Sequence, residues 1–337
     1  MNIQIGSRFI GPENPPFIVA ELSGNHNGSL KRLLRLVDAA ADAGADAVKL
    51  QTYTPETMTL NSSDPAFLVD KGPWTGEKLW DLYARAQTPW RWHAKVQARC
   101  KELGLEFFST PFDLTAVAFL KDLGVPAYKI SSFEIGDLEL IKACAATGKP
   151  VLISTGMAAT WEINKAKDAA LGLGILLHCI SDYPANPERM GLCLMPRLGG
   201  IYGLSDHSPG HETAIAAVAL GASVIEKHLC LSRRAGGVDA DFSMEPREFA
   251  ELTRACRSTW RAMQPPRGPV SVQGNDRYRR GLWIVQPVAK GEVVTASHIR
   301  ALRPAGKLSP IWINNVIGRR AAYDLSPGTA VDVDMLK

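Results

Sequence analysis

The chain has 337 residues, of which 46% are hydrophobic and 21% charged, proportions close to globular averages that exclude intrinsically disordered and collagen-like proteins. Its length predicts about two domains, one of which can be a large barrel. The formal net charge of +4 is spread along the chain with no Lys/Arg block, so we expect no nucleic-acid partner.

One pattern repeats up to about residue 263: a short apolar run, a polar or Gly/Pro junction, and a helical periodicity. Continuous apolar runs indicate strands buried on both faces, as in a parallel sheet with crossover helices. Eight such units predict a (β/α)8 TIM barrel over residues 1–265, whereas a doubly wound sheet lacks support because no GxGxxG follows the first run. The runs are FIVAEL from Phe17, AVKLQTY from Ala47, EFFSTPF from Glu106, AYKISSFE from Ala127, VLISTG from Val151, GILLHCI from Gly174, GIYGLSDH from Gly200 and SVIEKHLCL from Ser223.

The interval from Pro55 to Arg91 interrupts this pattern. It is long for a loop between a strand and a helix, and it is rich in aromatic residues. Long segments of this kind inside compact domains are usually lids or binding loops. An extra helix that covers the barrel rim is the alternative.

Pro and Gly cluster between Met263 and Arg280, where we expect a linker over residues 266–280. Short strand-like pieces, LWIVQPV and EVVT, follow it and predict a small β-rich domain over residues 281–337. A core of this size is marginal alone, so we expect the domain to lean on the barrel or on a partner subunit.

The six cysteines are scattered without a CxxC pair, which predicts free, mostly buried thiols in a reducing cytosol. The N-terminus lacks the basic and apolar regions of a secretory signal. The longest apolar stretch, from Ala214 to Ile225, is short of the ~20 residues that a membrane span needs. We therefore expect a soluble cytoplasmic protein without a membrane partner.

Polar residues stand near the ends of all eight runs, where the active site of a TIM barrel lies. Polar groups there are costly to bury unless they meet a ligand or each other. In chain order they are Glu21; Lys49 and Gln51; Ser109 and Thr110; Lys129, Ser131, Ser132 and Glu134; Ser154 and Thr155; His178, Ser181, Asp182 and Tyr183; Ser205, Asp206 and His207; and Glu226, Lys227 and His228.

Two histidines at neighbouring strand ends indicate a metal site. His207 ends the seventh run, and His228 shares a strand face with Glu226 because the two are two residues apart. Two imidazoles with oxygen ligands and water would suit Mn, Fe, Co or Zn. Hydrogen-bonded core histidines are the alternative.

Lys49 and Lys129 lie inside apolar runs, where lysine is rare unless it is paired. With the hydroxyls of Thr110 and Ser154 they predict a cradle for phosphate and carboxylate groups. Internal bridges to Glu21 and Glu134 are one alternative, and a Schiff-base lysine is another.

Four further residues need a separate interpretation. His26 and Asn27 either cap the next helix or touch a ligand, and His178 is a ligand contact or a core residue. Cys179 lies at a strand end without an obvious activating base, so we expect it in the core.

These segments together resemble the sialic acid synthase family. The motifs that carry the resemblance run in order through essentially the whole chain: FIVAELSGNHNG, AVKLQTYTPETMTL, FFSTPFD, YKISSFEIGDL, STGM, GLSDHSPG and IEKH. The family condenses phosphoenolpyruvate with the aldehyde of an N-acylated amino sugar, which gives a nine-carbon 2-keto acid and phosphate. The segment from about Gly281 is similar to the family's antifreeze-like (SAF) domain, and IRALRPAG resembles its arginine–proline motif.

Within the family, AELS, KLQTYTP and WTGEKLWDLYARAQTPWRWH resemble the branch of pseudaminic acid synthases. The acceptor implied is 2,4-diacetamido-2,4,6-trideoxy-altropyranose in its open-chain form. N-acetylneuraminate or legionaminate synthesis from a manno-configured acceptor is the alternative. A metal-dependent aldolase or hydrolase and a non-catalytic sugar-binding protein are more distant alternatives.

The resemblance also implies roles for individual residues. The metal pair falls on His207 and His228, with Mn²⁺ expected and Mg²⁺ or Co²⁺ as alternatives. The phosphoenolpyruvate contacts fall on Lys49, Thr110, Lys129, Ser132, Ser154, Ser181 and Ser205. The sugar contacts fall on Gln51, Tyr183 and Asp239, and the catalytic groups are Glu21, Glu134 and Lys129, the two carboxylates having exchangeable acid and base roles. Arg303 matches an arginine that the small domain lends to the neighbouring subunit's sugar site, which implies a domain-swapped homodimer.

Some positions depart from the family pattern. GGVDADFS stands around Asp239, and KHLCL follows the eighth run. His178 and Asp182 stand where Lys and a small residue are expected, and the stretch between the sixth and seventh runs is shortened. These departures concern the geometry near the sugar and the phosphate.

Overall fold

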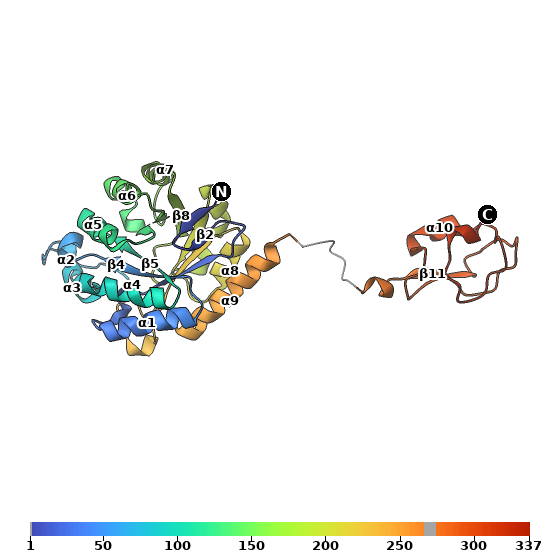
Figure 1. Cartoon of the computed structure of the whole chain (residues 1–337), viewed down its shortest axis with the longest axis horizontal. Coiled ribbons are helices and arrows are strands. Elements are labelled where there is room, and N and C mark those ends of the chain that lie inside the picture. Colours follow the sequence, from blue (N-terminus) through green and yellow to red (C-terminus); the bar gives the residue numbers. More distant parts are fainter. Residues whose placement is uncertain (1, 266–273) are drawn as a thin grey trace. The chain divides into compact units, whose positions relative to one another are not determined.

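A computed structural model describes residues 2–265 and 274–337. The chain divides into two compact units, Met1–Gln264 and Pro265–Lys337 (Figure 1). Residues 266–273 of the expected linker lie outside the described residues.

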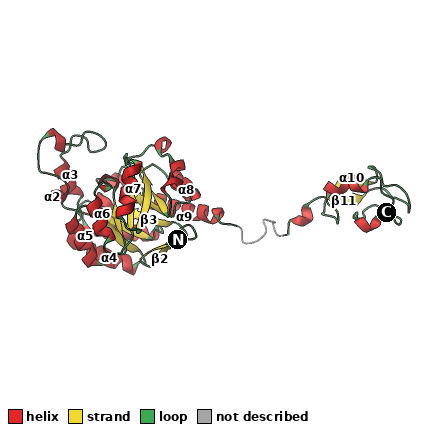
Figure 2. Ribbon diagram, turned by 90° about the horizontal axis from the view of Figure 1, so that it is seen from above, coloured by secondary structure: helices red, strands yellow, loops and turns green. Residues whose placement is uncertain are grey.

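The first unit contains a closed barrel of eight parallel strands, as the sequence predicts. Figure 2 shows these strands enclosed by helices. Neighbours in the barrel follow chain order, and the last strand, β10, pairs with the first, β3, so that His228 stands beside Glu21. The strands are β3 (Phe17–Glu21), β4 (Ala47–Thr52), β5 (Glu106–Pro111), β6 (Tyr128–Ile130), β7 (Val151–Ser154), β8 (Gly174–Cys179), β9 (Tyr202–Asp206) and β10 (Val224–His228).

Burial explains why the strand sequences are so apolar. Every residue of β3 and β10 is buried, because one face packs into the barrel and the other packs under helices. Helix α1 (Leu30–Asp42) shows the complementary pattern: Leu33, Leu36, Val37 and Ala40 are buried along one stripe. The Ser29 hydroxyl accepts a hydrogen bond from the Arg32 N–H and caps this helix.

The remaining helices of the first unit are α2 (Pro55–Met58), α3 (Leu79–Ala86), α4 (His93–Glu102), α5 (Leu114–Leu123), α6 (Leu138–Ala145), α7 (Thr160–Ala169), α8 (Glu212–Ala219) and α9 (Pro246–Met263). Short 3-10 helices cover Ser23–His26, Pro65–Phe67, Trp90–Trp92, Ser132–Glu134, Pro187–Arg189, Leu192–Leu198 and Arg233–Ala235.

The connection between β8 and β9 departs from a uniform strand–helix repeat. It holds two 3-10 helices, Pro187–Arg189 and Leu192–Leu198, in place of an α-helix. Proline removes backbone donors, and Pro196 lies inside the second of these helices. This connection therefore lacks the α-helix of a regular strand–helix unit.

The aromatic-rich interval contains both helices and a loop. It adds helices α2 and α3, and between them Leu68 and Lys78 form an antiparallel bridge. We call residues 68–78 the Trp74 hairpin, because Trp74 lies at its turn, where its carbonyl accepts from the Glu77 N–H.

A short antiparallel pair, β1 (Ile3–Ile5) and β2 (Arg8–Ile10), precedes the barrel and was not predicted. Its turn packs beside the start of β5, where the Glu106 carboxylate accepts hydrogen bonds from Ser7. Arg8 pairs with the buried Asp46 at 3.1 Å. The two strands therefore cover the N-terminal ends of the barrel strands.

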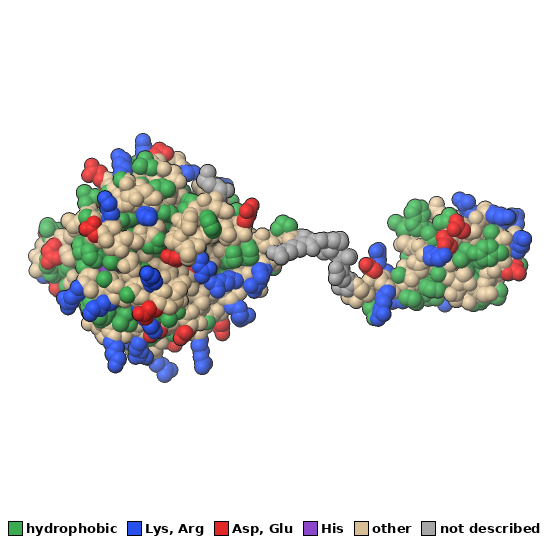
Figure 3. All heavy atoms as spheres, viewed as in Figure 1, with side chains coloured by type: hydrophobic (Ala, Val, Ile, Leu, Met, Phe, Trp, Pro, Cys, Tyr) green, Lys and Arg blue, Asp and Glu red, His purple; other side chains and the backbone are tan. Residues whose placement is uncertain are grey.

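The second unit has its own small core around β11 (Gly281–Ile284) and β12 (Ile299–Leu302). It also contains α10 (Ile313–Val316) and the 3-10 helices Asp276–Tyr278, Pro310–Trp312 and Val333–Met335. The expected EVVT strand was wrong in extent, because only a single bridge forms there, between Val293 and Arg320. Hydrophobic side chains lie on the surface of this unit (Figure 3), among them Ile311 and Trp312.

All six cysteines are free, and five of them are buried, as the sequence predicts. Among the described residues, the helices are too short or too polar to cross a membrane.

Candidate active site

A cavity of about 50 Å³ lies at the C-terminal ends of the barrel strands. This is the end where TIM-barrel enzymes place their chemistry. Most of the residues that line the cavity were predicted from the sequence, and Phe112 and Cys179 were not. The lining residues are Glu21, Lys49, Gln51, Thr110, Phe112, Lys129, Ser131, Ser132, Ser154, Cys179, Tyr183, Ser205, His207, Glu226 and His228.

Two buried lysines form the charged part of the cavity. The Lys49 Nζ lies 3.1 Å from the Thr110 hydroxyl, and the Lys129 Nζ lies 2.7 Å from the Ser154 hydroxyl. We call these four residues the anion cradle. Ammonium and hydroxyl groups converging in a water-poor site are strong ligands for phosphate and carboxylate oxygens.

Carboxylates occupy the same space as the lysines. The Lys49 Nζ lies 2.6 Å from Glu21 and 3.6 Å from Glu226, and the Lys129 Nζ lies 3.7 Å from Glu226. The internal bridge considered for Lys49 and Glu21 is therefore present. The partner considered for Lys129 was wrong, because the barrel brings it Glu226 from β10 where Glu134 was considered.

Burial and these pairs act against each other on the pKa values of the lysines. Burial lowers the pKa of Lys49, but Glu21 and Glu226 outweigh burial and raise it. Burial also lowers the pKa of Lys129, and there it dominates, although Glu226 opposes it. Lys49 is thus a firmly charged group and Lys129 the more readily deprotonated one.

The pKa values of the two partner carboxylates also shift in opposite directions. Burial raises the pKa of Glu21, which Lys49 only partly opposes. Burial would also raise the pKa of Glu226, but Lys129 and Lys49 outweigh it and lower that pKa. Glu226 therefore balances the charge of both lysines, and Glu21, which accepts a hydrogen bond from Gln51 at 3.0 Å, is the better proton acceptor.

The predicted hydroxyls surround the lysines. Ser132 and Ser181 share a hydrogen bond of 2.7 Å, and the Ser205 hydroxyl lies 3.4 Å from Glu226. Ser181 thus reaches the cavity through Ser132. Glu134 lies half-buried beside them, and its carboxylate accepts a hydrogen bond from the Ser131 hydroxyl. Burial raises the pKa of Glu134.

His207 and His228 face each other with ring centroids 5.5 Å apart. Nδ1 of His207 lies 3.0 Å from the Ile180 carbonyl oxygen, and Nδ1 of His228 lies 3.4 Å from the Ser23 hydroxyl. An Nδ1–H that donates to a carbonyl leaves the Nε2 lone pair free for a metal. Burial lowers the pKa of His228 well below its usual value, so its ring is neutral.

This donor set suits a metal held by two imidazoles together with water or substrate oxygens. In residues 2–265 and 274–337, no three His, Cys, Asp or Glu side chains are grouped closely enough to form a protein-only metal site. Water or substrate oxygens would complete such a site.

The predicted sugar-side residues lie on the imidazole side of the cavity or outside this unit. The Tyr183 ring packs 4.4 Å from the His207 ring, and burial raises the pKa of its hydroxyl well above 10.0. Asp239 is buried, and burial raises its pKa, which hydrogen bonds from Ser23 and Gly24 oppose. Arg303 lies in the second unit, exposed, one residue after β12.

Glu226 and Cys179 line the cavity but were given no role in it from the sequence. Glu226 was noted as a polar residue at a strand end, and its position two residues before His228 already put it on the inner face of β10. Cys179 is buried, as expected of a core residue, but it also faces the cavity. Its Sγ lies 3.8 Å from Nδ1 of His207, and although burial raises its pKa, His207 and Lys129 outweigh burial and lower it.

The remaining open interpretations are resolved as structural. Neighbouring side chains of a strand point to opposite faces, so His178 points away from the cavity that Cys179 faces. It forms a hydrogen bond with the Met190 carbonyl. His26 is buried against Thr88. Asn27 donates to the Gly236 carbonyl at 3.1 Å and ends the 3-10 helix Ser23–His26. It does not cap the next helix, α1, because Ser29 holds that position.

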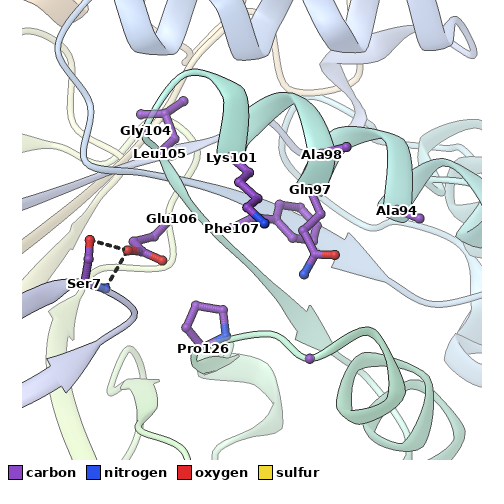
Figure 4. Close-up of a pocket in the computed structure, with 11 residues that line it drawn as sticks. Ser7, Ala94, Gln97, Ala98, Lys101, Gly104, Leu105, Glu106, Phe107 and Pro126 are labelled. Atoms are coloured by element: carbon purple, nitrogen blue, oxygen red, sulfur yellow. Dashed lines mark hydrogen bonds between the residues drawn. The ribbon is translucent and has the colours of Figure 1, made fainter.

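A larger cavity, of about 610 Å³, lies between α4 and the start of β5 (Figure 4). Lys101, Gln97 and Phe107 line it, and on its rim Glu106 accepts hydrogen bonds from the Ser7 N–H and hydroxyl at 2.7 and 2.8 Å. Because Glu106 begins β5, this cavity lies at the N-terminal ends of the strands, the end of a barrel that serves stability. We assign the chemistry to the smaller cavity.

Comparison with known proteins supports the same interpretation of the fold and motifs. The profile of the NeuB family matches residues 36–267, and that of the SAF domain matches residues 279–337. The chain belongs to the NeuB family. The resemblance to sialic acid synthases is thereby confirmed.

Named relatives of this NeuB-family chain align over nearly its whole length. Pseudaminic acid synthase of Helicobacter pylori is 38% identical over 331 residues, which cover 95% of this chain and 97% of the relative. N,N'-diacetyllegionaminic acid synthase of Campylobacter jejuni is 33% identical, covering 90% and 95%. Among solved structures, N-acetylneuraminic acid synthetase of Leptospira borgpetersenii superposes with a TM-score of 0.72 at 33% identity, covering 82% of this chain and 94% of that one.

Proposed function

We propose that this NeuB-family chain is a pseudaminic acid synthase. It would condense phosphoenolpyruvate with open-chain 2,4-diacetamido-2,4,6-trideoxy-altropyranose and water, and release pseudaminic acid and phosphate. The observation that carries the proposal is the placement of the anion cradle beside the facing His207 and His228. The names of the relatives at 38% and 36% identity support the choice of acceptor.

Phosphoenolpyruvate fits the anion cradle because it presents a phosphate and a carboxylate within one small molecule. Lys49 and Lys129 would bind these groups, with Thr110, Ser154 and Ser132 donating hydrogen bonds. The charges are fixed before the substrate arrives, so they stabilise developing charge with little reorganisation. Phosphoenolpyruvate would have to replace Glu21 and Glu226 as the partner of each lysine.

His207 and His228 would hold a divalent ion, Mn²⁺ by our proposal and Mg²⁺ or Co²⁺ as alternatives. When bound, such an ion supplies Lewis acidity at the acceptor carbonyl. The hydrogen bond at Nδ1 of His207 fixes the tautomer that leaves Nε2 free.

The reaction joins C3 of phosphoenolpyruvate to the aldehyde carbon of the sugar. A water then adds to C2, and phosphate leaves by cleavage of the C–O bond at C2. We assign to Glu134, which accepts a hydrogen bond from Ser131 at the cavity wall, the transfer of one proton from the attacking water to the departing phosphate. The second proton of this water is released when the C2 hydroxyl becomes the ketone, and it neutralises the alkoxide formed from the aldehyde. Glu21 lies next to Gln51 and His228, on the side of the acceptor. Burial raises the pKa of both carboxyls, which makes each a better proton acceptor.

We also propose that the protein works as a domain-swapped homodimer in the cytoplasm. Ile311 and Trp312 of the second unit are 79% and 52% exposed, and a partner subunit would cover such apolar groups. Arg303 of one copy would then complete the sugar site of the other. Six free cysteines fit a reducing compartment.

Complementation tests the swap. A chain with Arg303→Ala and a chain with Lys129→Met should each be inactive, and mixed dimers should regain activity because one intact site receives Arg303 from the other chain. If the mixture stays inactive while mixed dimers form, Arg303 does not act between subunits.

The test of the function is phosphate release from phosphoenolpyruvate in the presence of Mn²⁺. The acceptors compared are the altro-configured diacetamido sugar, its manno counterpart and N-acetylmannosamine. We expect a clear preference for the first. Preference for either other sugar would retain the reaction and refute the acceptor, and release without any acceptor would refute the condensation.

A further inference from the structure

Three aromatic rings from three separate segments meet above the histidine pair. Trp74 comes from the Trp74 hairpin, Tyr183 from the loop after β8, and Phe242 from the loop after β10. Their ring centroids lie 5.1 Å apart for Tyr183 and Phe242, and 6.0 and 6.2 Å from Trp74 to these two. We call these three residues the aromatic cap.

The aromatic cap is seated directly on the imidazoles. Tyr183 packs 4.4 Å from His207, and Phe242 packs 5.0 Å from His228. The anion cradle instead belongs to β4, β5, β6 and β7. A charged substrate held by the lysines therefore leaves the side under the cap to the neutral acceptor, whose aldehyde carbon must reach the same histidines.

Of the three cap residues, Tyr183 lines the cavity, and Trp74 and Phe242 pack against Tyr183 as an apolar surface. The indole N–H of Trp74 is already committed to the Val238 carbonyl, at 2.9 Å. Phe242 has no hydrogen-bonding group, and its loop is fixed by Asn25, which donates to the Leu229 carbonyl and the Ser243 hydroxyl at 3.0 and 2.9 Å. A methyl group packs well against such rings, whereas a hydroxyl there gives up its water without finding a partner.

The cavity is small for a sugar substrate. Its volume of about 50 Å³ is far below the roughly 300–1,000 Å³ of typical ligand pockets. Strands frame its other sides, while loops carry the cap. We therefore expect the acceptor to displace these loops, which would bring it against Trp74 and Phe242.

We propose that Trp74 and Phe242 determine specificity for an acceptor whose chain ends in a methyl group, as opposed to one that ends in a hydroxymethyl group. This inference rests on the proposed function, because it assigns the far end of the same acceptor. Adding one hydroxyl against an apolar pocket typically reduces kcat/KM by about 100-fold.

The experiment compares two acceptors that differ at C6 alone: 2,4-diacetamido-2,4,6-trideoxy-altrose and the same sugar with a C6 hydroxyl. We expect the unmodified protein to prefer the first by about 100-fold in kcat/KM. Trp74→Gln and Phe242→Asn place hydrogen-bonding groups in the aromatic cap and should each reduce this preference by about tenfold, with the KM for phosphoenolpyruvate unchanged. Trp161→Gln is the matched control, because Trp161 is an exposed aromatic residue at the start of α7 and outside the cap.

The outcomes separate the two proposals. Equal use of both acceptors by the unmodified protein overturns the specificity inference and leaves the proposed function standing. The specificity inference is likewise overturned if both cap variants keep the full preference. If the unmodified protein converts neither acceptor, the proposed function fails and the inference fails with it.

Discussion

Replacement of Lys227 by Met tests how the barrel holds its histidines. Asp206 and Lys227 are paired across β9 and β10, and each immediately precedes one histidine of the pair. Strand alternation turns them outward while His207 and His228 face the cavity. The Lys227 Nζ lies 2.7 Å from Asp206 and 2.6 Å from the Ser208 carbonyl oxygen, with both side chains at most 1% exposed.

The size of the effect follows from what remains around Asp206. Removing one partner of a buried ion pair costs about 3–5 kcal/mol. Asp206 would keep hydrogen bonds from the Ser208 N–H, the Ser208 hydroxyl and the Thr213 hydroxyl, at 2.9, 2.6 and 2.9 Å. These three donors place the loss at the lower limit, about 3 kcal/mol.

The assay is urea unfolding at neutral pH, supported by thermal melting. We expect Lys227→Met to lower the free energy of unfolding by about 3 kcal/mol, and Tm by roughly 6–12 °C for a domain of this size. The double variant Asp206→Asn/Lys227→Met should recover part of the loss, because it leaves no charge unpaired. A loss below about 1 kcal/mol, in the range of exposed ion pairs, would refute the reasoning.

Three further predictions concern the active site. His207→Ala should abolish Mn²⁺-dependent phosphate release, and a rate close to that of the unmodified protein would refute the metal assignment. Because burial holds the pKa of Lys129 below 10.5, its ammonium is protonated below that lowered pKa and lost as pH rises through it. The KM for phosphoenolpyruvate should therefore rise with pH before an exposed lysine would titrate. Lys129→Arg should remove this rise, and a variant that keeps the pH profile of the unmodified protein would contradict the assignment. Asn25→Ala removes the donor to Leu229 and Ser243, so urea unfolding should show a loss of about 1–3 kcal/mol, and no measurable loss would show that water replaces the amide.

The sequence by itself determined the barrel and the end at which its polar residues gather. Eight apolar runs separated by helical periodicity admit few other arrangements, because strands buried on both faces require helices on the outside. Placing Lys49, Lys129, His207 and His228 near strand ends was then enough to predict that they converge. Local spacing carries this information, since side chains alternate along each strand and parallel strands end together.

The tertiary structure alone decided which groups pair. Lys129 meets Glu226 because barrel closure brings β10 to the opposite side of the same cavity, a contact between residues far apart in the chain. The inward position of Cys179 and the outward position of His178 depend on strand register, which a shift of one residue would reverse. The aromatic cap likewise depends on loop paths, as Trp74 reaches Val238 across 164 positions of sequence. Periodicity reports burial along one segment, whereas these choices depend on which segments the closed barrel brings together.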